Sequence, residues 1–323
     1  MGRPFFFGAG IRIEKNLIDV SPVESYTRPM ETLNTMFGDY NKQVAVLSKS
    51  STFITEENVY QEGAADILPF LDKMAEALIL PGSGLDGLEN LEALFSKAEE
   101  GKSCLLLLEH YSNMDLSLFS YLVRKAGGRG NDIAKAVIAI AGMKLNEHNP
   151  VVAAFASAYT RIVIYPSRSL QGLDPEKHKA EGLRANAINR AAMKALNDLK
   201  TKGRLVLLFP SGTRYRPGDP STKKGVREID SYIKSFDYMC FVAINGMVLH
   251  VGQGDMMDDE VSRDVVRLSV GPVVSCAEFR DNAKAAETGD KKQAVADAIM
   301  AELEKMHVEG EEKRGALLGG KGR

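Results

Sequence analysis

Six short apolar runs, separated by longer segments with helical spacing, constrain the fold of this chain most strongly. They lie at residues 104–108, 136–141, 161–165, 205–209, 239–244 and 265–270. Apolar runs of this length that alternate with helices are typical of strands in a buried, largely parallel sheet. Helices are predicted at residues 115–125, 150–158, 175–200 and 291–307. The pattern therefore predicts an α/β fold with a mixed, largely parallel sheet flanked by helices.

The chain before the first run has a different pattern. Residues 22–47 and 55–80 carry apolar side chains at three- and four-residue spacing, which predicts helices, with a helix start at Thr55 and a kink at Pro69. Three glycines and a proline fall within residues 81–87, and such a cluster favours a domain boundary. We expect a small helical N-terminal domain at residues 1–84, an α/β domain at 85–308 and a flexible tail at 309–323.

Composition excludes several classes of protein. A net charge of -2 at pH 7 lacks the basic signature of nucleic-acid binders, so we expect no nucleic-acid partner. The longest apolar stretches fall short of the ~20 residues that a membrane-spanning helix needs, and no signal peptide is recognisable. The three cysteines, Cys104, Cys240 and Cys276, lie far apart in or beside apolar runs, which favours reduced thiols over disulfides or a metal site. We therefore expect a cytoplasmic protein.

A histidine and an aspartate follow the first apolar run. His110 and Asp115 lie in the segment LLLLEHYSNMDLSLF, and Asp115 begins a predicted helix. Ligands of α/β sheets bind outside the carboxyl ends of the strands, so this is a position where chemistry is expected. The carboxylate can accept a hydrogen bond from one imidazole nitrogen, which leaves the other free to accept a proton. Ser112 shows no sign of activation, so we expect the deprotonated hydroxyl to belong to a substrate.

The same spacing occurs a second time in the chain. His250 and Asp255 are also five positions apart, but two glycines lie between them and an acidic cluster follows. We interpret His250 as a structural residue. For His110 considered alone, a structural role at a strand end stays open as well.

Arginines follow two further apolar runs. Arg214 and Arg216 come after the fourth run and Arg168 after the third. Gly212 permits a tight backbone path, and alternate residues of an extended stretch point the same way, which predicts that Arg214 and Arg216 converge on one anion. Guanidinium groups suit phosphate oxygens in particular. Each arginine alone also fits a solvated surface position, and the shared strand-end placement favours a common site.

Together these residues resemble the glycerolipid acyltransferases, a family marked by a His-x4-Asp motif and a Phe-Pro-Glu-Gly-Thr-Arg motif. This chain has His110-Tyr-Ser-Asn-Met-Asp115 and Phe209-Pro-Ser-Gly-Thr-Arg214. The second motif is most similar to Pro-Ser-Gly-Gly-Arg-x-Arg-Pro of the soluble plastid-type glycerol-3-phosphate acyltransferases, because the chain continues to Arg216 and Pro217. The resemblance in motifs extends over residues 101–246 and implies that residues 85–308 are the catalytic domain.

The resemblance implies a glycerol-3-phosphate 1-O-acyltransferase. Such an enzyme transfers a fatty acyl group from a thioester to the sn-1 hydroxyl of glycerol 3-phosphate and gives lysophosphatidate, the first step of glycerophospholipid synthesis. His110 would be the base, Asp115 would orient it, and the phosphate would be held by Arg214, Arg216 and Arg168. The co-substrate would be an acyl carrier protein thioester or acyl-CoA, and no metal or other cofactor is implied.

The chain departs from the family pattern at three places. Ser211, which with Gly212 and Thr213 forms the supporting part of the second motif, replaces the glutamate of the wider family. Arg168 stands between two serines where the plastid enzymes carry a Lys-Lys-His run. The fourth family block, FVAING in this chain, lacks its usual proline.

Two alternatives stay open. The chain could acylate lysophosphatidate at its second position, or it could be a non-catalytic binder of anionic lipid or of acyl carrier protein. For the enzyme we expect a transient contact with a membrane surface on release of the lipid product, peripheral rather than spanning. An acidic acyl carrier protein would need a basic docking site. Candidates are the segments with Lys200, Lys202 and Arg204 and with Lys223, Lys224 and Arg227.

Overall fold

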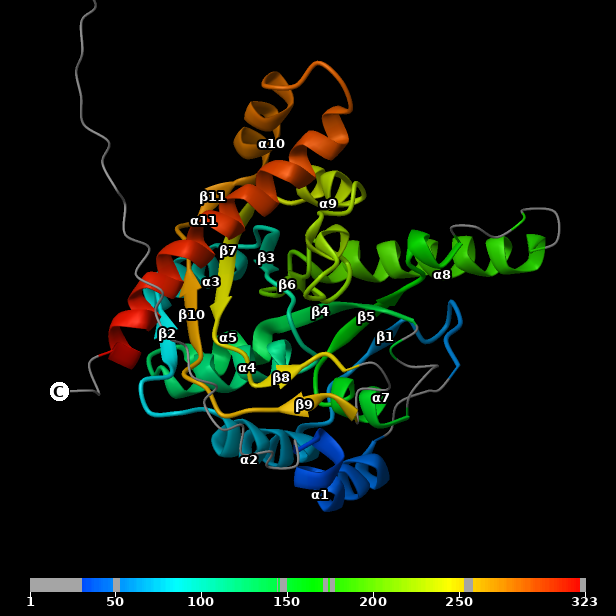
Figure 1. Ribbon diagram of the computed structural model, residues 1–323. Helices are drawn as coiled ribbons and strands as arrows, with labels where there is room; N and C mark the ends of the chain where they lie inside the picture. The colour runs from blue at the N-terminus through cyan, green and yellow to red at the C-terminus, as the bar shows by residue number, and fades with distance from the viewer. Residues whose placement is uncertain are drawn as a thin grey trace, which may run out of the picture. The chain divides into compact units, whose positions relative to one another are not determined.

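A sheet forms the centre of the computed structural model, which describes residues 31–48, 53–143, 145, 150–170, 174, 178–252 and 258–319. Within these residues its order is β1-β5-β4-β6-β3-β7-β10-β2, with β11 beside β7 (Figure 1). The strands are β1 (Tyr60–Gln61), β2 (Gly84–Asp86), β3 (Cys104–Leu108), β4 (Val137–Gly142), β5 (Arg161–Ile164), β6 (Leu205–Leu208), β7 (Tyr238–Asn245), β10 (Arg267–Val270) and β11 (Val274–Ser275). A separate hairpin pairs β8 (Leu249–His250) with β9 (Glu260–Val261).

The sheet is mixed and largely parallel, which confirms the predicted fold class. Strands β5, β4, β6, β3 and β7 run parallel to one another. Strand β10 is antiparallel to β7, and β1 is antiparallel to β5. All six predicted strands are present, with ends shifted by at most two residues. The carboxyl ends of the five central strands therefore meet at one edge of the sheet.

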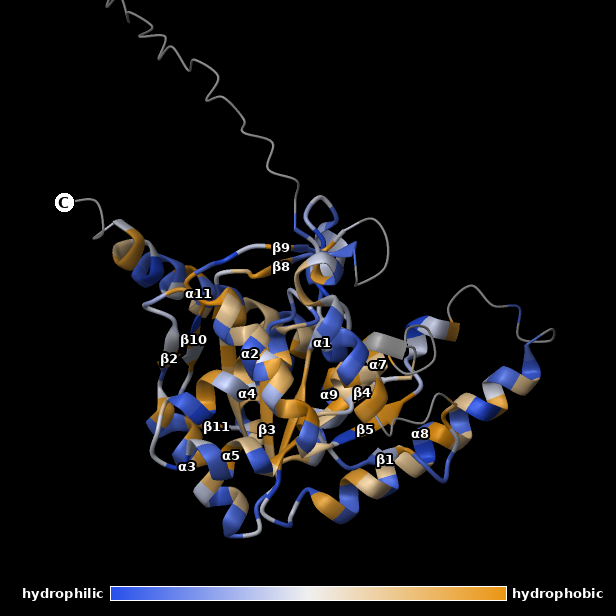
Figure 2. Ribbon diagram, turned by 90° about the horizontal axis from the view of Figure 1, so that it is seen from below, coloured by the Kyte–Doolittle hydropathy of each residue, from blue (hydrophilic) through white to orange (hydrophobic). Residues whose placement is uncertain are grey.

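Helices cover both faces of the sheet. They are α1 (Leu33–Leu47), α2 (Leu68–Leu78), α3 (Leu88–Glu99), α4 (Asp115–Lys125), α5 (Gly130–Ala136), α7 (Pro150–Ala156), α8 (Lys179–Leu199), α9 (Ile229–Ser235), α10 (Cys276–Ala285) and α11 (Lys291–Gly319). Short 3-10 turns are η1 (Ala65–Ile67), η2 (Ser167–Leu170) and η3 (Pro220–Lys223). Helices α1 to α7 pack on one face and α8 to α11 on the other. Figure 2 shows apolar residues gathered along the strands and the adjoining helices.

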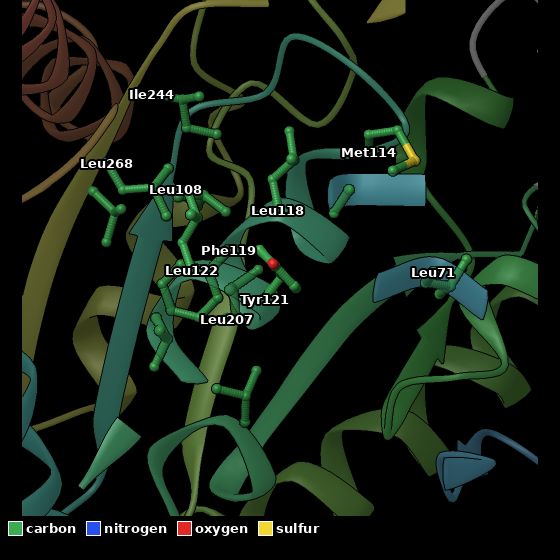
Figure 3. Close-up of a cluster of buried hydrophobic side chains, with 14 of the residues drawn as sticks. Leu71, Leu108, Met114, Leu118, Phe119, Tyr121, Leu122, Leu207, Ile244 and Leu268 are labelled. Carbon is green, nitrogen blue, oxygen red and sulfur yellow. The ribbon is translucent and has the colours of Figure 1, made fainter. Parts of the chain in front are cut away.

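Strand β3 contributes side chains to both hydrophobic clusters. Leu106 and Leu108 point into the cluster with α1 to α7, and Leu105 and Leu107 point into the cluster with α8 to α11. Figure 3 shows the first cluster, in which Leu108 lies with side chains from α2, α4 and neighbouring strands. Each fully buried leucine side chain stabilises the fold by about 1.5–3 kcal/mol. Because side chains alternate along a strand, burial on both faces requires the uninterrupted apolar run seen in the sequence.

The helices before residue 81 differ from the prediction. Residues 1–30 lie outside the described residues, and α1 begins after a capping box between Thr32 and Thr35. The predicted helix start at Thr55 is wrong, because the Asn58 side chain accepts the Thr55 N–H at 2.8 Å and closes a turn. Helix α2 begins only at Leu68. Pro69 lies in its first turn, where a missing N–H breaks no helical hydrogen bond, so the predicted kink is also wrong.

The segment expected as a domain boundary, residues 81–87, contributes the edge strand β2, which runs parallel to β10. Helices α1 and α2 lie in the same hydrophobic cluster as the sheet. The division of the chain at residue 84 stays a prediction. Helices α3, α5, α9 and α10 have no counterpart among the predicted elements; α5 and α9 span only seven residues each.

The flexible tail predicted from residue 309 is wrong for residues 309–319, since α11 continues to Gly319. The Asn245 amide at the end of β7 donates to the His307 carbonyl at 2.8 Å and to the Glu311 carboxylate at 3.2 Å. Further along the helix, Arg314 pairs with Asp264. These partners lie about fifty positions or more away in sequence, so local composition does not predict the contacts that hold this part of the helix. Residues 320–323 lie outside the described part.

The three cysteines are buried free thiols, in agreement with the sequence-based interpretation. Burial raises the pKa of Cys104, Cys240 and Cys276 to about 12, so each thiol stays protonated at neutral pH. None of the helices in the described residues is long and apolar enough to cross a membrane.

The close packing of α11 on β7 is testable at Gly310. A Cβ atom at this position would overlap the Asn245 side-chain amide. We predict that Gly310→Ala destabilises the fold by about 1–3 kcal/mol, the usual cost of overpacking. The matched control is Gly315→Ala in the same helix, where a Cβ meets no atom within 4 Å. It should stabilise by up to ~1 kcal/mol, because alanine favours helix. Urea unfolding measures both, and equal effects would contradict the packing.

Candidate active site

The loop between β3 and α4 is built around one buried carboxylate. Asp115, the first residue of α4, is 2% exposed. Its Oδ2 atom accepts from His110 Nδ1 at 2.9 Å and from the backbone N–H groups of Tyr111 and Ser112 at 2.6 and 2.8 Å. Its Oδ1 atom accepts from Ser112 Oγ at 2.7 Å. A buried charge with this many donors is stabilised, and it also lies at the positive end of the α4 dipole.

These contacts set the orientation of the His110 ring. An ionised carboxylate only accepts hydrogen bonds, so Nδ1 carries the hydrogen and the lone pair is on Nε2. No hydrogen bond to Nε2 is formed within the described part of the chain. The ring stacks on Phe209 with centroids 4.0 Å apart and planes at 19°. The side chain is 18% exposed, so a substrate can reach it. The pair can therefore accept a proton from a bound hydroxyl.

The second motif meets the first because β6 pairs directly with β3. Leu107 is in register with Leu208, so Phe209 and His110 leave neighbouring strand ends. The Tyr215 N–H donates to the His110 carbonyl at 2.8 Å. One pocket is lined by both loops, η3 and α11, through Leu108, Glu109, His110, Tyr111, Pro210, Ser211, Tyr215, Thr222, Lys223 and Met300. The structure thus brings together the two motifs that the sequence places a hundred residues apart.

The supporting residues form a fixed turn. Gly212 has a φ of 63°, a left-handed conformation that favours glycine, and its N–H donates to the Phe209 carbonyl at 2.9 Å. The hydroxyl of buried Ser211 donates to the Thr213 carbonyl at 2.7 Å. Ser211 therefore stabilises the turn that carries the arginine loop.

The three arginines have different surroundings. Arg214 Nη1 forms an ion pair at 2.9 Å with Asp259, which is itself buried. Arg216 is exposed, and its backbone N–H donates to Thr222 Oγ1 at 2.9 Å. Arg168 is exposed in η2. Among the described residues no hydrogen bond or ion pair joins the three, so their convergence on one anion stays a prediction.

The structure adds polar residues that the sequence reasoning missed. Asp259, the partner of Arg214, belongs to the acidic cluster noted after His250. Glu109 lies next to His110, is 4% exposed and contacts His307 on α11. An acidic residue that directly ends a run of four leucines is the signal that could have identified Glu109.

The second histidine pair differs from the first in its setting. His250 is an exposed residue of the β8–β9 hairpin, and its Nε2 atom contacts Ser262 Oγ at 2.8 Å. Its sequence partner Asp255 lies outside the described residues. Across residues 31–48, 53–143, 150–170, 178–252 and 258–319, no group of three or more His, Cys, Asp or Glu side chains could hold a metal ion.

The role of Asp115 as the centre of the loop predicts a graded loss of stability. Asp115→Ala leaves two backbone N–H groups and an imidazole N–H without their acceptor, so we expect a loss of about 1–3 kcal/mol. Asp115→Asn keeps one acceptor oxygen and should lose less. Ser112→Ala removes one hydroxyl, which donates to Asp115 and accepts from the Met114 N–H, and it leaves the contact of Asp115 with His110 in place, so it should lose least of the three. Urea unfolding of the three variants measures the order, and an Asp115→Ala variant as stable as wild type would contradict it.

Comparison with known proteins gives the family of this chain. A family model described as acyltransferase matches residues 85–287. No curated protein matches the chain. Among solved structures, the chain is similar to the 1-acyl-sn-glycerophosphate (LPA) acyltransferase PlsC from Thermotoga maritima, with 15% identity, a TM-score of 0.41, and coverage of 84% of this chain and 88% of that chain. The family model spans more than half of the 323 residues. This chain therefore belongs to the acyltransferase family.

Proposed function

We propose that this acyltransferase moves a fatty acyl group from a thioester to the sn-1 hydroxyl of glycerol 3-phosphate and forms lysophosphatidate. The observation that carries the proposal is the His110–Asp115 pair at the carboxyl end of β3. Nδ1 of this pair is bound to the carboxylate, and Nε2 is left to accept a proton. The backbone contact between Tyr215 and His110 supports a shared site, because Tyr215 lies between Arg214 and Arg216.

The proposed reaction uses His110 twice. Nε2 accepts the hydroxyl proton of the acceptor while the oxygen attacks the carbonyl carbon of the thioester. The carbon–sulfur bond then breaks, and the imidazolium returns the proton to the departing thiolate. Asp115 stabilises the imidazolium between these steps. A general base of this kind contributes about 10²–10⁴-fold, so the larger part of the acceleration depends on positioning the two substrates.

For the acceptor, we assign the phosphate to the arginine loop. Arg216 is exposed and available to a phosphate, while Arg214 is fixed by Asp259 and would offer its remaining N–H groups. Arg168 is proposed as a third cation. Glycerol 3-phosphate and lysophosphatidate share this phosphate, so the choice between them rests on the sequence Pro210-Ser-Gly-Thr-Arg-Tyr-Arg-Pro217, which resembles the plastid-type motif. Acylation of lysophosphatidate is the alternative that the assay below separates.

For the donor, a neighbouring pocket favours one of the two basic segments. A pocket of about 310 Å³ is lined by Pro220, Lys223, Lys224, Met300, Ala301, Glu304 and Glu109. It shares Glu109, Lys223 and Met300 with the pocket of His110. The segment with Lys200, Lys202 and Arg204 precedes β6 and lies at the opposite end of that strand from Phe209. We therefore propose that the acyl carrier protein or CoA thioester approaches past Lys223 and Lys224.

The base assignment is tested with both histidines that carry the five-residue spacing. We predict that His110→Ala lowers kcat by about 10²–10⁴-fold, because the base is lost. His250→Ala is the matched control and should leave kcat unchanged, because His250 lies on the separate hairpin. Product formation is followed with acyl carrier protein and CoA thioesters as donors and glycerol 3-phosphate or lysophosphatidate as acceptors.

The identity of the product then decides between the candidate functions. Lysophosphatidate formed only by proteins that keep His110 supports the proposal. Phosphatidate formed from lysophosphatidate, without turnover of glycerol 3-phosphate, would establish the alternative acceptor. No product with any pair of substrates would contradict enzymatic function and favour the non-catalytic binder.

The two motif arginines should respond differently to substitution. Arg216→Ala removes an exposed cation, so we predict a higher KM for the acceptor and unchanged stability. Arg214→Ala should raise the KM for the acceptor too. In addition it should destabilise the fold by about 3–5 kcal/mol, because buried Asp259 loses its cation. The double variant Arg214→Ala/Asp259→Ala should recover part of the lost stability, because no unpaired charge stays buried. Its KM for the acceptor should stay as high as that of Arg214→Ala. Steady-state kinetics and urea unfolding provide both values; equal stability of the two single variants would contradict the assigned ion pair.

A further inference from the structure

A network of polar groups, buried except for half-buried His307, lies beside His110 and takes no part in the proposed chemistry. Glu109 Oε2 accepts from the Ile244 N–H of β7 at 2.8 Å and from His307 Nδ1 of α11 at 3.0 Å. Glu109 Oε1 accepts from the Tyr111 hydroxyl at 3.0 Å. The same hydroxyl lies 3.2 Å from His307 Nδ1. Three elements far apart in sequence, the β3–α4 loop, β7 and α11, therefore meet at one carboxylate.

The charges around this network favour a protonated His307. Burial acts to lower the pKa of His307, but the hydrogen bond and the charge of Glu109 outweigh it, so the pKa is raised above its usual value. Lys223 opposes this effect and Glu304 adds to it. The pKa of the Tyr111 hydroxyl is raised by burial and by Glu109, which keeps it a neutral donor. Both pKa shifts therefore favour the protonated forms of His307 and Tyr111, which donate to the Glu109 carboxylate.

Tyr111 links this network to both sides of the active-site pair. Its backbone N–H donates to Asp115 Oδ2 at 2.6 Å, the same oxygen that binds His110 Nδ1. Its ring packs edge-on against Tyr215, with centroids 6.0 Å apart. Tyr215 in turn donates its N–H to the His110 carbonyl. A displacement of Tyr111 would therefore change the contacts that orient His110.

Helix α11 does not need this network as its main attachment. Three of its side chains, Val295, Ile299 and Leu303, are fully buried in the hydrophobic cluster formed by α8 to α11 and the sheet. Beyond His307, Arg314 pairs with Asp264 and donates to the Val265 carbonyl at 2.8 Å. Separate contacts hold the helix on both sides of His307, so the polar contacts of His307 are available for another role.

We propose that His307 is a positioning residue for acyl transfer, acting through Glu109 and Tyr111 to hold the loop at residues 109–115 and thus His110. This inference rests on the proposed function of His110 as the base. His307 is not assigned any contact with substrate. His307 acts on the fraction of molecules in which His110 Nε2 faces the acceptor hydroxyl. A small misplacement of a reacting group lowers the rate strongly, so this fraction determines kcat.

The kinetic test compares three variants on α11. His307→Ala removes the network contact, and we predict that kcat falls by about 10–100-fold while KM stays within about twofold. His307→Asn keeps an N–H donor near the Nδ1 position and should recover most of the lost kcat. Arg314→Met removes a different anchor of the same helix, so it should lower thermal stability and leave kcat unchanged. If His307→Ala affects kcat no more than Arg314→Met does, the proposal is overturned.

Hydrogen exchange gives a readout that does not depend on activity. The N–H groups of Tyr111, Ser112 and Tyr215 are the donors that hold the two loops. In His307→Ala we predict faster exchange in peptides covering residues 109–115 and 213–217, with less change in His307→Asn and none in Arg314→Met. Unchanged exchange in His307→Ala would overturn the positioning role. Wild-type protein without acyl transfer would overturn the proposed function, while exchange would still decide the role of His307.

Discussion

The hydrogen bonds to the Asp115 carboxylate are the interaction on which the candidate site depends. One oxygen accepts from the His110 imidazole and from two successive backbone N–H groups, and the other accepts from Ser112. The same group thus closes the loop after β3, lies as a negative charge in the first turn of α4 and selects the tautomer of His110. Both carboxylate oxygens of Asp115 accept these hydrogen bonds, and the residue is buried. A substitution of Asp115 would therefore change the conformation of the loop and the orientation of His110 together.

The parallel sheet supplies the second condition. β3 pairs with β6 in a register that places Phe209 under the imidazole and the Pro210–Pro217 segment beside it. Both strands are buried on both faces, so their ends are rigid points from which short loops can hold side chains in a defined geometry. The fold therefore brings His110 and the Pro210–Pro217 segment together, and the Tyr215 N–H joins them by its hydrogen bond to the His110 carbonyl.

The sequence predicted what depends on local pattern. Strand β3 and helix α4 have the predicted bounds, because an apolar run, an acidic residue at the helix start and an amphipathic repeat all lie within twenty-two residues. It did not predict contacts between distant segments. Arg214 and Asp259 are 45 positions apart, and Glu109 and His307 are 198 apart, so neither pair leaves a local signal. The continuation of α11 to Gly319 was missed for the same reason, since Asn245 of β7 holds it.

The tautomer of His110 tests the central claim most directly, because it reports on the Asp115 contact without any assumption about substrate. Long-range proton–nitrogen NMR spectra of the imidazole, assigned by substitution of each of the five histidines in turn, distinguish the two ring nitrogens. For neutral His110 the account predicts a protonated Nδ1 and an unprotonated Nε2, with a mixture of both forms in Asp115→Ala. A neutral ring protonated at Nε2 in wild-type protein would contradict it, since no lone pair would then face the acceptor hydroxyl.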